Sequence, residues 1–181
     1  CVRTEDTLDA AGFKVGDYFE HIWLKWKLVQ QYLQQDDVKD VYWFDADVAM
    51  LSNLRGCVDT EGADFMHQVE FTDQPGSLNG GQLWFRRCAA VDDYIREVMK
   101  KSSNRGKLDQ WWAMEALTKV PALRTRGLPT DRFLSACWTN LTETDTDFGR
   151  ACTFHANCIG GPVKKLAAMR TALKRHKAAV P

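Results

Sequence analysis

A short apolar segment that ends in two closely spaced carboxylates constrains the fold of this chain more than any other feature. Val41-Tyr42-Trp43-Phe44 is a continuous run of β-branched and aromatic residues, which predicts a buried strand. Asp45-Ala46-Asp47 follows it directly. A helix, a tight turn, a buried strand and then acids form the α/β pattern, in which ligands bind beyond the carboxyl ends of the strands. The segment therefore predicts an α/β fold with a ligand site at Asp45 and Asp47.

The rest of the chain fits a single domain over residues 1–181. Apolar side chains recur at three- and four-residue spacing from Asp17 to about Gln35, which predicts an amphipathic helix before the strand. Further helices are expected at 89–101 and 109–118, and a basic C-terminal helix at about 164–177, with 166–176 as its centre. Strands are expected at 63–66 and 82–86, a turn at 79–81, a mixture of loop and strand at 123–134 and a polar loop at 142–149.

Composition excludes two classes of partner. The chain has 24 Lys+Arg and 24 Asp+Glu, so its formal net charge is zero, whereas nucleic-acid-binding domains are usually basic. No apolar run approaches the ~18 residues needed to span a membrane. The charge is nevertheless divided, with a net charge of −9 over residues 1–75 and +9 over residues 76–181. Such a division is compatible with one half holding a cation and the other meeting an anion.

Asp45 and Asp47 are candidate ligands for a divalent cation. Two carboxylates one residue apart repel each other unless a cation lies near them, and hard cations such as Mg²⁺ or Mn²⁺ prefer oxygen ligands. The simpler interpretation is a solvated strand end with two surface acids. The apolar residues on both sides of Asp45-Ala46-Asp47 favour the metal site, because acids between two apolar segments need a partner.

Three other segments carry candidate functional residues. His155 could complete a metal site, although a structural histidine is the simpler interpretation. The glycines of Gly160-Gly161 let the backbone approach an anion, and Lys164 or Lys165 could add a positive charge. Asn79-Gly80-Gly81 also allows a ligand to come close to the backbone, or forms a plain hairpin turn. Asp109-Gln110 is either an ordinary helix start or a contact to a polar substrate.

The cysteines and one sequon bear on metal binding and on the compartment. Cys152, His155 and Cys158 have the spacing C-x2-H-x2-C, which suggests a zinc site, but no second pair matches it. The pairing of six cysteines cannot be deduced from the sequence. Asn140-Leu141-Thr142 is a glycosylation sequon and is compatible with the secretory pathway.

In this order the motifs resemble those of nucleotide-diphospho-sugar transferases with the GT-A fold. The resemblance is greatest to a retaining plant and algal group of arabinosyl- and xylosyltransferases, family seventy-seven. It covers about residues 20–166 and implies a mixed, Rossmann-like sheet flanked by helices. Its motifs are K-L-V-Q-Q-Y-L (27–33), V-Y-W-F-D-A-D-V-A-M-L (41–51), L-N-G-G-Q-L-W-F-R (78–86), L-D-Q-W-W (108–112) and H-A-N-C-I-G-G-P-V-K-K (155–165).

The resemblance also implies a role for each matching residue. It implies a metal-dependent, retaining transfer of a hexose or pentose from a nucleotide-diphosphate sugar, such as a UDP-sugar, to a hydroxyl of a glycan or glycoprotein in the Golgi lumen. The implied ligands of Mn²⁺ or Mg²⁺ are Asp45, Asp47 and His155. The residues implied to contact the donor are Lys27, Asn79, Gly80, Gly81 and Lys164 or Lys165. The resemblance also implies that Asp109 and Gln110 lie beside the donor sugar.

Two departures from this pattern leave alternatives open. Only 44 residues precede Asp45, so the N-terminal nucleoside-binding segment of the fold is expected to be truncated or reduced. A degenerate transferase that binds ligands without turnover is therefore one alternative. A haloacid-dehalogenase-type phosphatase is another, with Asp45 as nucleophile and Asp47 as general acid, although Asp92-Asp93, the later acidic pair, falls inside an expected helix.

Overall fold

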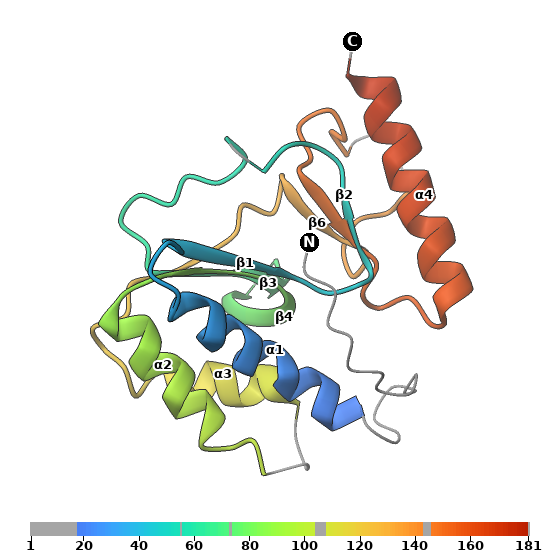
Figure 1. Ribbon diagram of the computed structural model, residues 1–181. Coiled ribbons are helices and arrows are strands. Elements are labelled where there is room, and N and C mark those ends of the chain that lie inside the picture. The colour runs from blue at the N-terminus through green and yellow to red at the C-terminus, as the bar shows by residue number, and fades with distance from the viewer. Residues whose placement is uncertain (1–17, 55, 73, 104–107, 143–145, 181) are drawn as a thin grey trace.

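A computed structural model gives the structure of the chain (Figure 1). The structure describes residues 18–54, 56–72, 74–103, 108–142 and 146–180. Its architecture is a mixed α/β fold with two sheets, which confirms the predicted fold class. Within the described residues, no helix is both long and apolar enough to cross a membrane.

The larger sheet has four strands in the order β1-β4-β3-β5. The strand predicted at 41–44 is β1 (Asp40–Phe44), and it runs antiparallel to the long strand β4 (Gln74–Arg86). The prediction that it is buried is wrong, because β1 is an edge strand of the sheet and its residues 41–44 are only partly buried. On the other side of β4 lies β3 (Phe65–Phe71), also antiparallel, and β3 pairs in parallel with β5 (Thr125–Gly127). Both parallel and antiparallel pairs are present, so the sheet is mixed, as expected.

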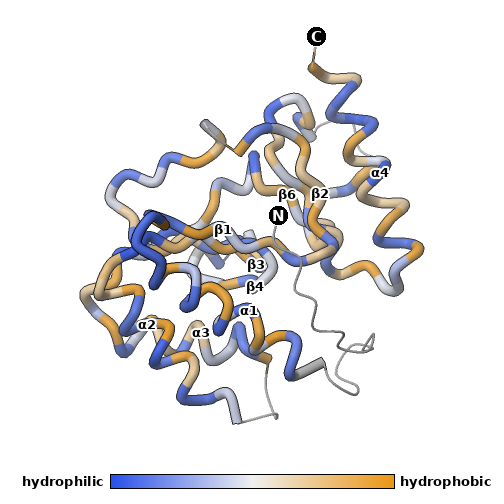
Figure 2. The backbone as a smooth tube through the Cα atoms, viewed as in Figure 1, coloured by the Kyte–Doolittle hydropathy of each residue, from blue (hydrophilic) through white to orange (hydrophobic). Residues whose placement is uncertain are grey.

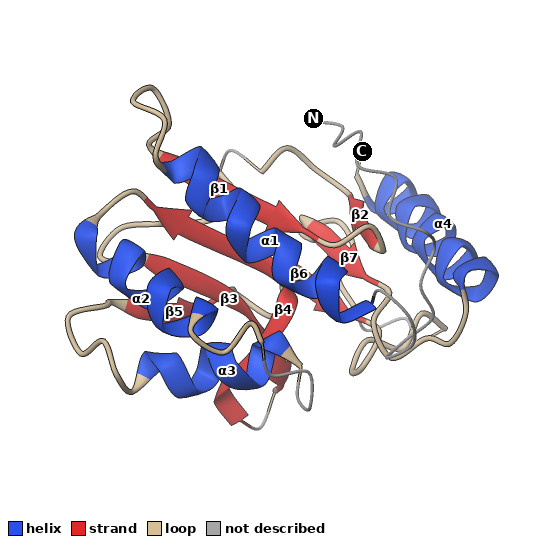
Figure 3. Cartoon of the chain, turned by 60° about the horizontal axis from the view of Figure 1, so that its bottom comes forward, coloured by secondary structure: helices blue, strands red, loops and turns tan. Residues whose placement is uncertain are grey.

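Three helices cover one face of this sheet, as Figure 3 shows: α1 (Tyr18–Leu33), α2 (Ala89–Met99) and α3 (Asp109–Leu117). Trp26 of α1 is fully buried at the centre of the layer, with edge-on contacts to Phe85 of β4 at 5.9 Å and to Tyr94 of α2 at 6.0 Å between ring centroids. The aromatic contacts give this face large apolar burial and fix α1 against the sheet.

A second, smaller sheet carries the remaining helix. Its order is β2-β7-β6, with β2 (Val48–Met50) antiparallel to β7 (Thr153–His155) and β7 parallel to β6 (Phe133–Ser135). The basic C-terminal helix α4 (Pro162–Ala179) packs on this sheet. Figure 2 shows polar and apolar residues alternating along α4, consistent with one packed and one solvated face.

A bulge in β4 corrects one sequence prediction. The segment 79–81, predicted to be a turn, lies inside β4. His67 of β3 pairs with Leu83, but the next residue, Gln68, pairs with Asn79, so three residues of β4 (80–82) have no partner on β3. The extra residues are a β-bulge. The glycines predicted to close a hairpin instead bend a continuous strand.

Most other element predictions hold. The helices predicted at 89–101 and 109–118 are present as α2 and α3, within two residues at each end. The C-terminal helix is longer than predicted, because Pro162 at its first turn is compatible with a helix start. Asp17, placed at the start of the first helix, and 143–145 of the predicted polar loop lie outside the described residues.

Candidate functional site

A cavity of about 680 Å³ lies where the two sheets meet. We call it the central cavity. Its walls come from α1, the end of β1, the bulge of β4, the start of α3, the segment after β7 and the start of α4. Segments far apart in the sequence therefore supply its lining, and most of the residues singled out in the sequence belong to it.

Backbone pairing brings Asp45, Asp47 and His155 together in this cavity. The amide of Asp45 donates to the carbonyl of Gly81 at 2.9 Å, which places Asp45 beside the bulge. Val48 pairs with His155 across β2 and β7, and the amide of Ala156 donates to the carbonyl of Asp47 at 2.9 Å. One ligand atom from each of Asp45, Asp47 and His155 lies within 4.8 Å of the others.

Hydrogen bonds fix the orientation of His155. Its ring is 3% exposed, and Nδ1 lies 2.7 Å from Oε1 of Gln68 on β3. An amide oxygen only accepts hydrogen bonds, so Nδ1 carries the proton in this contact. Nε2 faces Oδ1 of Asp47 at 3.2 Å. With a proton on Nε2 the ring donates to Asp47; without that proton, Nε2 has the lone pair of a metal-binding histidine whose other nitrogen is held by a hydrogen-bonding partner.

Asp47 is held as a carboxylate by two cationic or hydrogen-bonding neighbours. Burial alone would raise its pKa, but hydrogen bonds and charge from His155 and Lys165 outweigh burial and hold the pKa of Asp47 well below its ordinary value. Lys165, in the first turns of α4, donates to Oδ2 of Asp47. Asp45 accepts a hydrogen bond from Trp43 Nε1 at 2.7 Å. Both acids are therefore oriented by the fold.

The donor set fits a divalent cation. Two carboxylates and one imidazole offer two oxygen ligands and one nitrogen ligand within a few ångströms of each other. Mg²⁺ and Mn²⁺ accept such ligands and commonly retain water or substrate oxygens in the other positions. Asp45, Asp47 and His155 are the residues that would hold the ion.

A buried ion pair forms the opposite wall. Asp109, the first residue of α3, is 4% exposed. Its Oδ2 accepts from Trp26 Nε1 at 2.8 Å and lies 2.8 Å from Nζ of Lys25. Lys25 also donates to the carbonyl of Gly80 at 2.9 Å, which ties α1 and α3 to the bulge. Gln110 follows Asp109 and lines the central cavity.

The bulge brings the backbone of β4 against the histidine. A Cβ atom at Gly81 would lie 2.1 Å from Cε1 of His155, so only glycine leaves room for the ring there. Asn79 accepts from the amide of Gly81 at 2.8 Å and donates to Glu70. The sequence pattern had suggested close approach of a ligand to these glycines, whereas the close approach at Gly81 is to His155.

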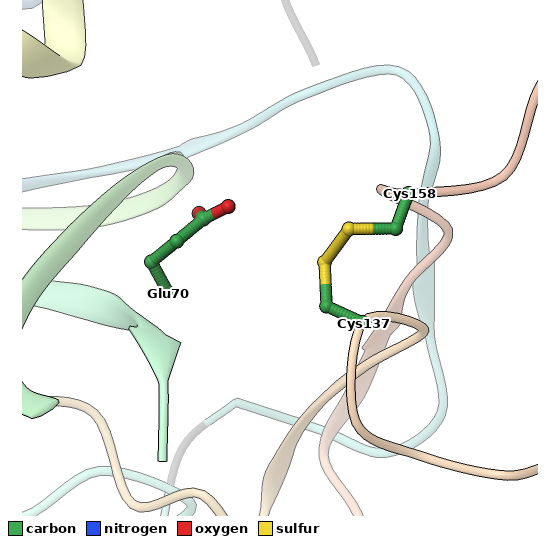
Figure 4. A group of neighbouring side chains, drawn as sticks. All are labelled: Glu70, Cys137 and Cys158. Atoms are coloured by element: carbon green, nitrogen blue, oxygen red, sulfur yellow. A yellow bond between two sulfur atoms is a disulfide. The ribbon is translucent and has the colours of Figure 1, made fainter. Parts of the chain in front are cut away.

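Disulfides correct the zinc interpretation. Cys152 is bonded to Cys57, and Cys158 is bonded to Cys137. Disulfide sulfurs are not thiolates and do not ligate zinc, so the C-x2-H-x2-C spacing is not a metal site. A carboxylate oxygen of Glu70 lies within 4.8 Å of the sulfurs of the Cys137–Cys158 bridge (Figure 4), but that group cannot act as a thiolate site either.

The structure brings most of the sequence candidates into the central cavity but not Lys27 and Lys164. Both lysines are exposed, and neither lines the cavity. Lys165 lies there rather than Lys164, and Lys25 rather than Lys27. Helical periodicity carried the signal for Lys25, because it lies three residues after Ile22 and four before Val29, on the apolar face.

Gln68 and Glu70 are further residues near the site that the sequence analysis missed. Both lie on β3, beyond the end of the strand predicted at 63–66. Their position depends on the register of β3 against the bulged strand β4, and no local pattern in the sequence indicates that register.

Comparisons with known proteins agree with this fold. The sequence profile of the family described as nucleotide-diphospho-sugar transferase matches residues 1–169. A comparison with curated protein sequences gives no match. Among solved structures, the fold is similar to mouse xyloside xylosyltransferase 1 in its apo form, with a TM-score of 0.50 and 15% identity. That alignment covers 85% of this chain and 69% of the mouse chain.

The fold is thus that of a GT-A-type glycosyltransferase. The chain belongs to the nucleotide-diphospho-sugar transferase family. Membership implies a nucleotide-sugar donor and an acceptor, and it removes the haloacid-dehalogenase alternative. Asp92 and Asp93, which that alternative required near the site, are exposed on α2.

Proposed function

We propose that this chain is a metal-dependent, retaining glycosyltransferase that moves a hexose or pentose from a UDP-sugar to a hydroxyl group of a glycan or glycoprotein. The proposal is carried by one observation. Asp45 and Asp47 from one segment and His155 from another meet beside a lysine at a helix N-terminus in one cavity. Such a set is suited to a cation and a diphosphate together.

The diphosphate would lie between the acids and the start of α4. Mn²⁺ or Mg²⁺ held by Asp45, Asp47 and His155 would stabilise the negative charge that develops on the leaving diphosphate. Gly160 and Gly161 line the cavity just before Pro162, and their lack of side chains lets the diphosphate approach the backbone. Lys165, now paired with Asp47, supplies a positive charge within reach of the same space.

The donor sugar would lie toward the wall formed by Asp109, Gln110 and Gly80. Lys25 and Trp26 hold the Asp109 carboxylate in one orientation, so it can accept a hydrogen bond from a sugar hydroxyl without reorganising. Gln110 offers both an acceptor and donors. These residues recognise and orient the sugar.

Retention fits the way Asp109 and Glu70, two carboxylates of the central cavity outside the proposed metal ligands, are engaged. Asp109 is paired with Lys25, and Glu70 accepts from Asn79. Glycosidases need two facing carboxyl groups that are available for acid, base or nucleophilic work. In a retaining transferase, the leaving phosphate can instead take the proton of the acceptor hydroxyl, so the chain has only to hold both sugars in place.

The oxidising lumen of the secretory pathway, such as the Golgi, is the compartment we propose. Four described cysteines form the bridges Cys57–Cys152 and Cys137–Cys158, and disulfides persist mainly in oxidising compartments. The glycosylation sequon is compatible with the same compartment.

Release of UDP from a panel of UDP-hexoses and UDP-pentoses tests the activity. The assay is run with Mn²⁺, with Mg²⁺ and with EDTA, in the presence of simple glycosides as acceptors. We expect one donor to be consumed with Mn²⁺ or Mg²⁺ and none with EDTA, and the anomeric configuration of the product, read by NMR, to match that of the donor. Turnover that is unaffected by EDTA would contradict metal dependence, and an inverted product would contradict retention.

The degenerate transferase remains the alternative to turnover. It predicts metal-dependent binding of UDP without consumption of any donor. Measuring binding and turnover on the same preparation therefore separates a binding module from an enzyme.

A further inference from the structure

The sequon Asn140-Leu141-Thr142 forms an ordered turn at the surface. Oδ1 of Asn140 accepts two hydrogen bonds from Thr142, one from its amide at 3.0 Å and one from its hydroxyl at 2.7 Å. Asn140 is exposed. No other Asn-x-Ser/Thr occurs in the 181 residues, so any N-linked glycan on this chain has one possible acceptor.

We propose that Asn140 carries an N-linked glycan. The donor would be a lipid-linked oligosaccharide diphosphate, used by the oligosaccharyltransferase of the secretory pathway. A bond forms between Nδ2 of Asn140 and C1 of the first sugar, and the bond between C1 and the diphosphate oxygen breaks. The amide loses one proton, and the lipid diphosphate leaves. This modification is independent of the proposed transferase activity.

The hydrogen bonds from Thr142 are compatible with the modification. Both hydrogen bonds from Thr142 end on Oδ1, while the glycan attaches to Nδ2, so neither bond has to break. The turn is also held against α4, because Arg175 of α4 donates to the carbonyl of Leu141 at 2.7 Å. Arg175 itself lies over the ring of Phe148 at 4.4 Å. A glycan on Asn140 therefore leaves the packing of α4 intact.

A hollow beside Asn140 is suited to the first sugar. A depression of about 400 Å³ is lined by Asn140, Trp138, Leu141 and Ile159, among others. Partly exposed aromatic and aliphatic side chains pack well against the apolar face of a sugar ring. Ile159 also lines the central cavity. The chain around Ile159 therefore lies between the central cavity and the hollow in which the glycan would sit.

The disulfides support the required compartment by an observation separate from the sequon. Cys137, three residues before Asn140, is bonded to Cys158. The segment that carries Asn140 is therefore held by a disulfide, and disulfides form and persist in oxidising compartments. Oligosaccharyltransferase works on chains that enter the same oxidising lumen.

Expression of the full chain behind a cleavable signal peptide in a eukaryotic cell line tests the proposal. Intact-mass measurement of the secreted wild type should show one N-glycan, removed by an endoglycosidase. Asn140→Gln and Thr142→Ala should lack that mass, and Thr142→Ser should keep it, because serine retains the hydroxyl. Asn53→Gln, at an exposed asparagine outside any sequon, is the matched control and should keep it.

Two results would overturn the proposal. One is secreted wild type with the mass of the bare polypeptide. The other is a glycan mass that persists in Asn140→Gln. If Asn140→Gln failed to be secreted, Thr142→Ala, which leaves the asparagine in place, would still decide whether the sequon is used.

Discussion

Lys25 and Asp109 form the charge pair on which one wall of the central cavity depends. Their side chains are 5% and 6% exposed. A buried pair of this kind adds little stability compared with apolar residues of the same size, but losing one partner leaves an unpaired charge inside the protein. Lys25 also donates to Gly80. The pair therefore links α1, α3 and β4 at the point where the donor sugar is proposed to lie.

Lys25→Ala should destabilise the protein strongly, and Lys27→Ala should not. Removing Lys25 leaves Asp109 buried without its cation, which costs about 3–5 kcal/mol. Lys27 is exposed on the same helix, so its removal should change the free energy of unfolding by no more than about 0.5 kcal/mol. Urea unfolding of both variants measures this. Equal losses in the two variants would show that the ion pair is not buried as described.

Single residues also show the limit of prediction from sequence. Asp45, Asp47 and His155 are placed by strand ends and strand pairing, and the motif order pointed to all three. Lys25 and Gln68 were missed. Lys25 lies on the apolar face of its helix, where a charge is normally not expected, and Gln68 reaches His155 only through a bulged register. Helical periodicity places Lys25 on that face, but no local pattern indicates the register that brings Gln68 to His155.

Among the secondary-structure elements, the bulged strand β4 controls the site. Its glycines leave space for the ring of His155 and for Lys25, while the amide of Asp45 binds the carbonyl of Gly81. The bulge thus connects the acids, the histidine and the Lys25–Asp109 pair through one strand.

Gly81→Ala should impair metal binding more than folding. The added methyl group meets the His155 ring at 2.1 Å, so the imidazole must shift from its position beside Asp47. Misplacing groups that orient metal ligands typically costs about 10–100-fold in metal affinity, and we expect a loss in that range for Mn²⁺. Gly76→Ala is the matched control on the same strand, because no atom lies within 4 Å of its Cβ position. Titration with Mn²⁺ measures both, and unchanged affinity in Gly81→Ala would contradict the role of His155.

The segment between β7 and α4 is the second controlling element. It connects His155 to Gly161, and Cys158 within it has a left-handed backbone with φ of 59°. The bond from Cys158 to Cys137 holds this conformation, which is unfavourable for a residue with a side chain. Ser135 adds a hydrogen bond to Asn157 at 2.6 Å.

Replacing Cys137 and Cys158 together by serine should weaken UDP binding while the fold survives. The segment would regain backbone freedom, and each residue that must be ordered on binding costs about 1–2 kcal/mol. We expect the affinity for UDP in the presence of Mn²⁺ to fall by about tenfold or more. Cys88→Ser, a change at the cysteine without a disulfide among the described residues, should bind as wild type does. Full affinity in the double variant would show that the bridge does not organise the site.

For the whole molecule, two sheets meet at the central cavity, and one disulfide connects two segments beside the smaller sheet. Cys57, after β2, is bonded to Cys152, directly before β7. The fold class, the order of the helices and the presence of the strand before Asp45 were predictable because each depends on a local hydrophobic pattern, whereas the edge position of that strand was not. The division into two sheets and the cysteine pairing were not, because both depend on contacts between residues far apart in sequence.

Removing the Cys57–Cys152 bridge should lower stability more than removing Cys137–Cys158. Its cysteines are 95 positions apart, against 21 for the other bridge. Chain-entropy estimates give about 4–5 kcal/mol for the longer loop and about 3 kcal/mol for the shorter one. Thermal unfolding of the two Cys-to-Ser double variants ranks them. The opposite order would show that strain or residual structure outweighs loop entropy.

Isothermal titration with UDP tests the metal-dependent donor site most directly. Wild type should bind UDP with Mn²⁺ and lose that binding in EDTA. Asp47→Ala, with folding checked by circular dichroism, should lose metal-dependent binding by more than the roughly 10–100-fold typical of residues that only support a ligand. Binding of UDP by folded Asp47→Ala with wild-type affinity in the presence of Mn²⁺ would contradict the proposed site.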